Sequence, residues 1–133
     1  MNQIQQEHQK LIDSLSSSLK ERGYEILQME SKDYPQPEKF GRHTPDIIAK
    51  TDKGLIVIGE AKTSEDIASE RSKEQYWDFS TRQMAEGLLR GQSVEFHIIV
   101  PRKVDLENLR KILYDLGLNV RIGKNIFLWY LKE

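Results

Sequence analysis

Apolar and polar residues recur along this chain with two different periods, which together predict three helices and five strands. Near the N-terminus the period is helical, with apolar residues at Leu11, Ile12, Leu15 and Leu19. Gly23 follows at the position of a C-terminal cap, because glycine readily adopts the left-handed conformation that often ends a helix. The pattern therefore predicts a helix over about residues 5–22.

Shorter apolar or alternating runs are typical of strands, and they lie at residues 24–29, 46–49, 55–58, 94–100 and 120–131. The second and third runs are separated by Thr51-Asp52-Lys53-Gly54, which has the composition of a turn, so we expect them to pair. The last run contains Gly123-Lys124-Asn125 and is expected to form a strand or a hairpin. Residues 31–44 are polar and contain two prolines, so they are expected to form a loop over the end of the second strand.

Two further helices are expected in the second half of the chain. Thr63 and Asp66 have the spacing of an N-terminal cap and its capping box, and the charged segment after them is expected to run as a helix to about Leu89. A frayed or looped segment before Ser72 is the alternative for its start. Asp105 is expected to cap a third helix, which Gly117 ends. The order is α-β-β-β-α-β-α-β, which predicts an α/β fold with a central mixed sheet flanked by helices. At 133 residues, the chain is expected to form a single domain, 1–133.

The composition is that of a globular protein, with 38% hydrophobic and 31% charged residues. No apolar run is long enough to cross a bilayer, so no membrane contact is expected. The N-terminus lacks the basic and apolar segments of a secretory signal, and there is no cysteine. Disulfides, thiolate metal sites and a cysteine nucleophile are therefore excluded, and we expect a cytoplasmic location.

The net charge is only −1, whereas proteins that bind nucleic acid usually carry a basic surface. Any phosphate-binding surface must then be local, or be supplied by a bound metal ion or a partner. Arg71, Lys73 and Arg82 are candidates for a local basic strip, although a helix face of mixed charge is commonly just solvated. The charge neither supports nor excludes a protein that acts on nucleic acid.

Two carboxylates and one amine flank the predicted pair of strands. Asp46 follows Pro45 at the start of the first strand, and Glu60-Ala61-Lys62 begins fourteen positions after Asp46, at the end of the second. Because side chains alternate along a strand, Glu60 and Lys62 are expected on one face and Ala61 on the other. Carboxylates suit Mg²⁺, which prefers oxygen ligands, and an ammonium group can stabilise a developing oxyanion. The arrangement predicts metal-assisted cleavage of a phosphodiester.

The spacing alone is weak support, because the chain contains a second segment of the same form. Glu30-Ser31-Lys32 also places a glutamate two positions before a lysine, and Asp13 precedes it by seventeen positions. That set fails on context, since Asp13 falls in a predicted helix rather than in a paired strand. The alternative interpretation of Glu60 and Lys62 is an acid–lysine pair at the wet end of a strand, which would have no function.

The motif Pro45-Asp46…Glu60-Ala61-Lys62, on two neighbouring strands, resembles the signature of the PD-(D/E)xK nuclease superfamily. This is the fold of type II restriction enzymes and archaeal Holliday junction resolvases. The predicted order of elements is similar to the core of that superfamily, so the resemblance implies a restriction-endonuclease-like fold over nearly the whole chain. Residues 73–80, where Gln75 precedes an aromatic–serine pair, resemble the helix that follows the signature lysine in resolvase-like members.

The resemblance implies a role for each residue of the motif. Asp46 and Glu60 would bind Mg²⁺, for which Mn²⁺ is expected to substitute, together with the carbonyl oxygen of Ala61. Lys62 would orient the attacking water or stabilise charge on the phosphate. The metal ion would polarise the phosphoryl oxygen and lower the pKa of the bound water.

Two further residues are implied by the same resemblance. Gln75 would hold a phosphate or a water from the following helix, and a solvated helix glutamine is the alternative. Resolvase-like proteins often place an additional metal-binding glutamate on the opening helix, and Glu7 is the best match for it. Glu7 lies further from Gly23 than that comparison suggests, and a glutamate near a helix N-terminus is also favourable for electrostatic reasons alone.

These residues predict a small Mg²⁺-dependent endonuclease that acts on DNA, with Asp46, Glu60, Lys62 and Gln75 as the catalytic group. RNA stays open as a substrate. No sequence-reading module is recognisable, so specificity is expected from the shape of the substrate, from a homodimer or from a partner protein. The first alternative is a catalytically silent subunit of the same fold that binds nucleic acid or protein. The second is an α/β scaffold whose acid–lysine cluster is a surface pair.

Overall fold

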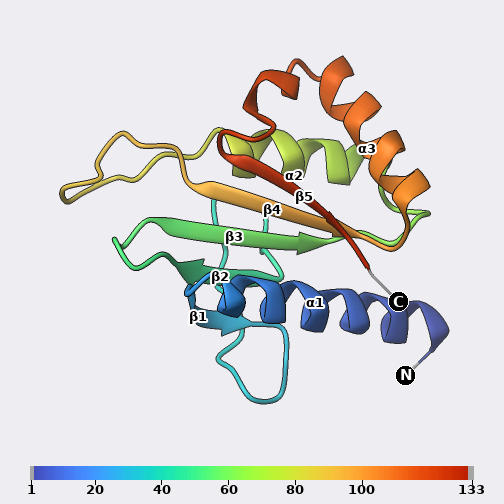
Figure 1. Cartoon of the computed structure of the whole chain (residues 1–133), viewed down its shortest axis with the longest axis horizontal. Coiled ribbons are helices and arrows are strands. Elements are labelled where there is room, and N and C mark those ends of the chain that lie inside the picture. Colours follow the sequence, from blue (N-terminus) through green and yellow to red (C-terminus); the bar gives the residue numbers. More distant parts are fainter. Residues whose placement is uncertain (1, 132–133) are drawn as a thin grey trace.

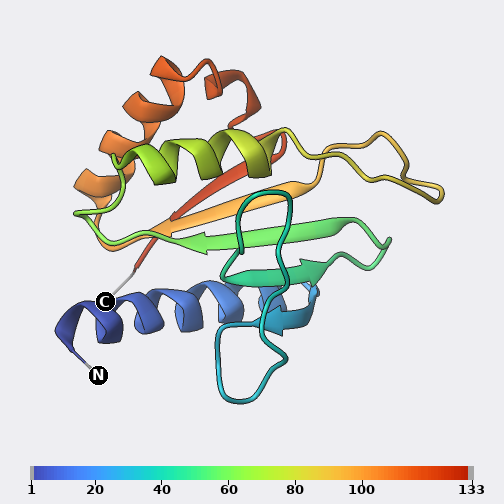
Figure 2. The ribbon, with the colours of Figure 1, turned by 180° about the vertical axis from the view of Figure 1, so that it is seen from behind.

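The computed structural model of the chain describes residues 2–131 and contains a five-stranded sheet with helices on both of its faces (Figures 1 and 2). The elements are α1 (Gln3–Glu21), β1 (Glu25–Met29), β2 (Ile47–Lys50), β3 (Ile56–Ala61), α2 (Glu70–Ser80), β4 (Glu95–Val100), α3 (Lys103–Asp115), a short 3₁₀ helix (Asn119–Arg121) and β5 (Ile126–Tyr130). The order of helices and strands predicted from the sequence is confirmed, with the 3₁₀ helix added before the last strand. The α/β class and the mixed sheet are confirmed as well.

The strands lie in the order β1-β2-β3-β4-β5, so neighbours in the sheet are also neighbours along the chain. The first three strands are antiparallel, and β3, β4 and β5 are parallel to one another. The predicted pairing across residues 51–54 is present, with Ile47 opposite Gly59 and Lys50 opposite Ile56. Its turn uses Gly54 at φ +92°, a conformation that side chains other than glycine rarely adopt.

The two faces of the sheet have separate apolar layers. Helix α1 lies along one face, and α2 and α3 cover the other (Figure 1). The layer under α1 is built from the helix and from β1 to β4, with Leu11, Ile12, Leu15, Leu19, Ile47, Ala49, Val57 and Ile99 among its buried residues. The opposite layer contains Ile58, Tyr76, Phe79, Phe96, Ile98, Leu109 and Leu113. Strand β3 contributes to both layers and is therefore buried on both sides, as its nearly continuous apolar run predicts.

Helix α1 packs unusually close to the sheet at Gly59. A Cβ atom added at Gly59 would lie 3.0 Å from the Leu15 side chain and 3.1 Å from Ile47 Cβ. The glycine in the middle of β3 therefore allows the helix to approach the strand that ends in the proposed site. None of the helices in residues 2–131 is long and apolar enough to span a membrane.

The predicted end of the second helix is wrong, and its start agrees with the alternative of a looped segment before Ser72. Helix α2 begins after Ser69, whose hydroxyl accepts a hydrogen bond from Ser72 N–H at 3.1 Å, and residues 64–68 form turns instead. It ends at Ser80 rather than at Leu89. Residues 81–93 turn back on themselves, and Gln83 pairs with Ser93 in an antiparallel bridge. The apolar spacing continues past Ser80, but hydrogen bonds to the returning segment replace those of a helix.

Two smaller predictions about the C-terminal third need correction. Asp105 is not the N-cap of α3 but its third residue, where its carboxylate accepts a hydrogen bond from Arg102 N–H at 3.1 Å. Within the predicted run at residues 120–131, the strand β5 covers only Ile126–Tyr130, because the run begins inside the 3₁₀ helix Asn119–Arg121. Gly117 ends α3 at φ +77°, as the sequence predicts.

Candidate active site

Asp46, Glu60 and Lys62 lie together in a cleft of about 370 Å³ at the C-terminal end of β3. The antiparallel register places Asp46, the residue before β2, beside the last residues of β3. Asp46 N–H donates to the Gly59 carbonyl at 3.1 Å and to Glu60 Oε1 at 3.0 Å. In return, Ala61 N–H donates to Asp46 Oδ2 at 2.8 Å. The two carboxylates are thus fixed by the backbone of each other's strand.

The Lys62 side chain is only 3% exposed and is surrounded by acceptors. Its Nζ lies 3.4 Å from Glu60 Oε2 and 3.5 Å from Asp66 Oδ2, and it donates a hydrogen bond to Gln75 Oε1. Gln75 comes from the buried face of α2, and Asp66 comes from the turns before that helix. A buried ammonium needs such partners, because removing it from water is costly unless other groups replace the water.

The carboxylate of Glu60 is the electrostatically strained group of the cleft. Burial raises the pKa of Glu60 well above its usual range, and the charge of Asp46 raises it further, against the opposing effect of Lys62. Glu60 uses Oε1 to accept from Asp46 N–H and Oε2 to face Lys62. In this arrangement its two oxygens hold the cleft together rather than standing open to an incoming ion.

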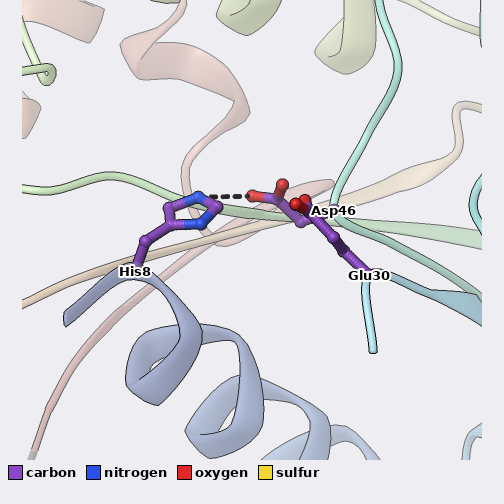
Figure 3. A group of neighbouring side chains, drawn as sticks. All are labelled: His8, Glu30 and Asp46. Carbon is purple, nitrogen blue, oxygen red and sulfur yellow. Dashed lines mark ion pairs between the residues drawn. The ribbon is translucent and has the colours of Figure 1, made fainter. Parts of the chain in front are cut away.

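A second group of side chains opens onto the same cleft. His8 from α1, Glu30 from the residue after β1 and Asp46 each offer one ligand atom, and these atoms lie within 4.8 Å of one another (Figure 3). His8 Nε2 lies 3.4 Å from Asp46 Oδ2. Imidazole and carboxylate groups both bind divalent cations, so the chemistry of this set fits a metal ion.

The pKa values of His8 and Glu30 are shifted in the same direction. The hydrogen bond to Asp46 raises the pKa of His8, and the Ala61 carbonyl adds to the effect, although burial opposes it. Burial and the neighbouring Asp46 charge raise the pKa of Glu30. Together with Glu60, these groups hold protons more tightly than they do in water. A bound cation would relieve the same excess of negative charge.

The residues predicted from the sequence are brought together with one exception. Asp46, Glu60, Ala61, Lys62 and Gln75 all line the cleft. Ala61 contributes its N–H to Asp46 and its carbonyl oxygen toward His8. Glu7 is exposed and instead lines a separate hollow of about 810 Å³ beside the start of α3.

His8 and Glu30 were not expected at the site. The signal for His8 lies in the helix period, because it falls in the middle of the stripe formed by Leu11, Ile12 and Leu15, whereas Glu7 falls at the edge of that stripe. Glu30 belongs to Glu30-Ser31-Lys32, the segment that has the spacing of the motif but not its strand context. It takes part as a single carboxylate, because the pairing of β1 with β2 sets it opposite Asp46, with Glu30 N–H donating to the Asp46 carbonyl at 3.0 Å.

The remaining walls of the cleft come from the loop and from α2. Gln36, Pro37 and Thr44 belong to the loop before Asp46, which lies over the site as expected. Arg71 lines the cleft from the first turn of α2, and among residues 2–131 it has no ion-pair or hydrogen-bond partner. Lys73 pairs with Glu70 at 3.7 Å, and Arg82 lies over the Phe40 ring. Of the three residues of the predicted basic strip, Arg71 is the one that lines this cleft.

No protein-family model matches this chain, and no curated protein or solved structure matches it either. Its function is therefore inferred from the geometry and chemistry of the cleft.

Proposed function

We propose that this protein is a metal-dependent endonuclease with a restriction-endonuclease-like core, which hydrolyses phosphodiester bonds in DNA. One observation carries the proposal. Two carboxylates and a buried lysine, from strands that are separate in sequence, converge in one open cleft, and the lysine is held there by Gln75 and Asp66. A surface acid–lysine pair would not be buried or held in this way.

The charge balance of the cleft supports a role for a metal ion. Four carboxylates line it, from Glu30, Asp46, Glu60 and Asp66, against the cations Lys62 and Arg71. A phosphate would be repelled from such a cleft unless a cation is bound first. A local ion would also help a chain of net charge −1 to act on nucleic acid.

In the proposed reaction, His8, Glu30 and Asp46 would hold the metal ion. When bound, the ion would polarise a phosphoryl oxygen and make bound water more acidic. Lys62 would stabilise the negative charge that develops on the phosphate, since its Nζ is already fixed and desolvated. Water would attack phosphorus, the bond to the leaving oxygen would break, and the products would be a phosphomonoester and a hydroxyl. Arg71 would contact a neighbouring phosphate at the edge of the cleft.

A cleavage assay tests the proposal. The purified chain is incubated with Mg²⁺ or Mn²⁺ and with labelled duplex, single-stranded and branched DNA, and with RNA. We expect cleavage that chelation of the metal abolishes, and a loss of about 10²- to 10³-fold in Lys62→Met. Lys53→Met, in the turn between β2 and β3, is the matched control and should cleave like wild type. The proposal fails if no substrate is cut with either metal, or if folded Lys62→Met cuts as fast as wild type.

A catalytically silent subunit is the second candidate, and one observation favours it. Both oxygens of Glu60 are used inside the protein, and the net charge of the chain is only −1. Such a subunit would bind nucleic acid or a partner protein without cutting. Binding of DNA by the wild type with no cleavage under any metal would favour this candidate over the enzyme.

A further inference from the structure

We infer that the site formed by His8, Glu30 and Asp46 selects a first-row transition-metal ion, represented by Mn²⁺, over Mg²⁺. The sequence alone predicts a site of oxygen ligands from Asp46, Glu60 and the Ala61 carbonyl. The structure adds the imidazole nitrogen of His8, and this ligand changes which ion the site suits. The inference rests on the proposed function only where activity is measured, because ion binding needs no substrate.

The ligands reach the site from three separate elements. His8 lies on the sheet-facing side of α1, Glu30 directly follows β1, and Asp46 directly precedes β2 (Figure 3). Their donor atoms lie within 4.8 Å of one another, with 3.4 Å between His8 Nε2 and Asp46 Oδ2. A single ion between them would therefore tie α1 to the first two strands.

Each ligand-bearing segment is held in place by contacts that do not involve an ion. Glu30 N–H donates to the Asp46 carbonyl at 3.0 Å, which joins the ends of β1 and β2. Gln9 Nε2 donates to the Glu30 carbonyl at 3.3 Å, which fixes α1 beside the same point. Asp46 Oδ2 accepts from Ala61 N–H at 2.8 Å. The convergence is thus built into the fold, and binding requires little rearrangement.

The site is open to water on two sides. His8 and Glu30 line the catalytic cleft and also an adjoining hollow of about 620 Å³, which includes Ile4, Gln5 and Thr63. Three protein ligands leave coordination positions for water or for a phosphate oxygen. A buried structural metal site would instead surround the ion with protein groups.

The ligand set decides between ions on chemical grounds. Mg²⁺ is a hard cation that prefers oxygen and retains several of its waters, so an imidazole adds little to its binding. First-row transition-metal ions accept imidazole and carboxylate ligands together. Neutral His8 therefore adds affinity for Mn²⁺ without adding comparable affinity for Mg²⁺.

The binding test uses the full-length chain with Mn²⁺ as the probe and Mg²⁺ as the competitor, and it follows the EPR signal of the free Mn²⁺ ion. We expect one Mn²⁺ per chain, displaced only when Mg²⁺ is in excess by about 100-fold or more. Pulsed EPR should show coupling of bound Mn²⁺ to an imidazole nitrogen. Absence of binding, displacement by equal Mg²⁺ or absence of that nitrogen coupling in wild type would overturn the inference.

Two variants of His8 make the test specific. His8→Gln should lose the nitrogen coupling and bind Mn²⁺ more weakly by about tenfold or more. His8→Glu restores an anionic oxygen ligand, and it should lower the preference for Mn²⁺ over Mg²⁺ by about tenfold or more while still binding an ion. Glu7→Gln, one position earlier on α1, should bind Mn²⁺ like wild type. The inference fails if His8→Glu keeps the wild-type preference, or if Glu7→Gln is the variant that loses Mn²⁺.

Activity separates this inference from the proposed function. If Mn²⁺ binds with nitrogen coupling but no nucleic acid is cut, the proposed function fails and the metal preference stands. If nucleic acid is cut equally well at limiting concentrations of either ion, and His8→Glu changes neither rate, the metal preference fails and the proposed function stands.

Discussion

Two clusters of polar side chains within residues 2–131 differ in whether their charges are balanced from within. The cluster of Tyr24, Glu95, His97 and Trp129, which we call the closed cluster, pairs each donor with an acceptor. Trp129 Nε1–H donates to His97 Nδ1 at 2.9 Å, so the proton of the neutral ring is on Nε2, which faces Glu95 Oε1 at 2.9 Å. Tyr24 OH donates to the same carboxylate at 2.9 Å. The Glu95 carboxylate therefore accepts hydrogen bonds from two donors, His97 and Tyr24.

The cleft has the opposite balance. Burial and the charge of Asp46 raise the pKa values of Glu30 and Glu60, and neither His8 beside Glu30 nor Lys62 beside Glu60 offsets this fully. In the closed cluster, burial lowers the pKa of His97, and the hydrogen bonds from His97 and Tyr24 lower the pKa of Glu95 although burial opposes this. A balanced buried cluster stabilises the fold, whereas an unbalanced one that opens to solvent is suited to binding a cation.

The largest expected effect separates the two histidines that contact these acids. His97 is fully buried, so His97→Ala leaves a cavity, an unpaired Trp129 N–H and a Glu95 carboxylate with only the Tyr24 hydroxyl as donor. We expect it to lower the free energy of unfolding by about 3–5 kcal/mol. His8→Ala removes one ion pair at the cleft and should change the free energy of unfolding by less than about 1 kcal/mol. Urea unfolding of both variants at neutral pH measures the difference, and equal costs would remove the distinction between the clusters.

Replacing an acid by its amide should have opposite signs in the two clusters. Glu95→Gln loses the charge that strengthens two hydrogen bonds, and it should destabilise the fold by about 1–3 kcal/mol. Asp46→Asn keeps an acceptor for Ala61 N–H, relieves the repulsion at Glu60 and Glu30, and should stabilise the fold by about 1 kcal/mol. Thermal and urea unfolding without divalent ions measure both. Loss of stability in Asp46→Asn would show that the acids of the cleft are balanced after all.

The pH dependence of stability should also differ in sign. Since the pKa of His97 is lowered, the unfolded chain binds a proton below about pH 6.5 that the folded chain excludes, so this group favours unfolding as the pH falls. The pKa values of Glu30, Glu60 and His8 are raised, so the folded cleft binds protons first and is favoured as the pH falls. The stabilisation from Asp46→Asn should therefore be larger at pH 8 than at pH 5.5. A gain that is constant with pH would contradict this assignment.

The smallest effect concerns a single hydroxyl. Tyr24→Phe removes the second donor to Glu95 and leaves the ring in place, so it should cost about 0.5–1.5 kcal/mol. Tyr114→Phe, on the exposed side of α3, is the control and should be close to neutral. If the two variants unfold at the same urea concentration, the Tyr24 hydroxyl is not part of the balance at Glu95.

Local patterns in the sequence predicted the strands of the site, but not all of its members. The apolar runs around Asp46 and Glu60 are continuous, and the turn between them requires glycine, so their pairing was readable. The end of α2 could not be predicted from the sequence. Met84 keeps the helical spacing of apolar residues, but its N–H donates to the Gln92 carbonyl at 2.8 Å instead of to a carbonyl within the helix. Glu30 joins the site through the register of β1 on β2. That register depends on the whole sheet, and no short segment encodes it.

The loop between β1 and β2 has both of its ends at candidate metal ligands. Glu30 and Asp46 are joined at its base by a backbone hydrogen bond of 3.0 Å. Arg42, near the Asp46 end of the loop, forms an ion pair with Asp78 on α2 at 3.1 Å. The two ends of the loop are therefore fixed by contacts close to them, and loop length itself has only a weak effect on closure entropy. We expect the segment between these contacts to tolerate lengthening while the ligands stay in register. It is the natural place to graft a new binding sequence beside the proposed active site.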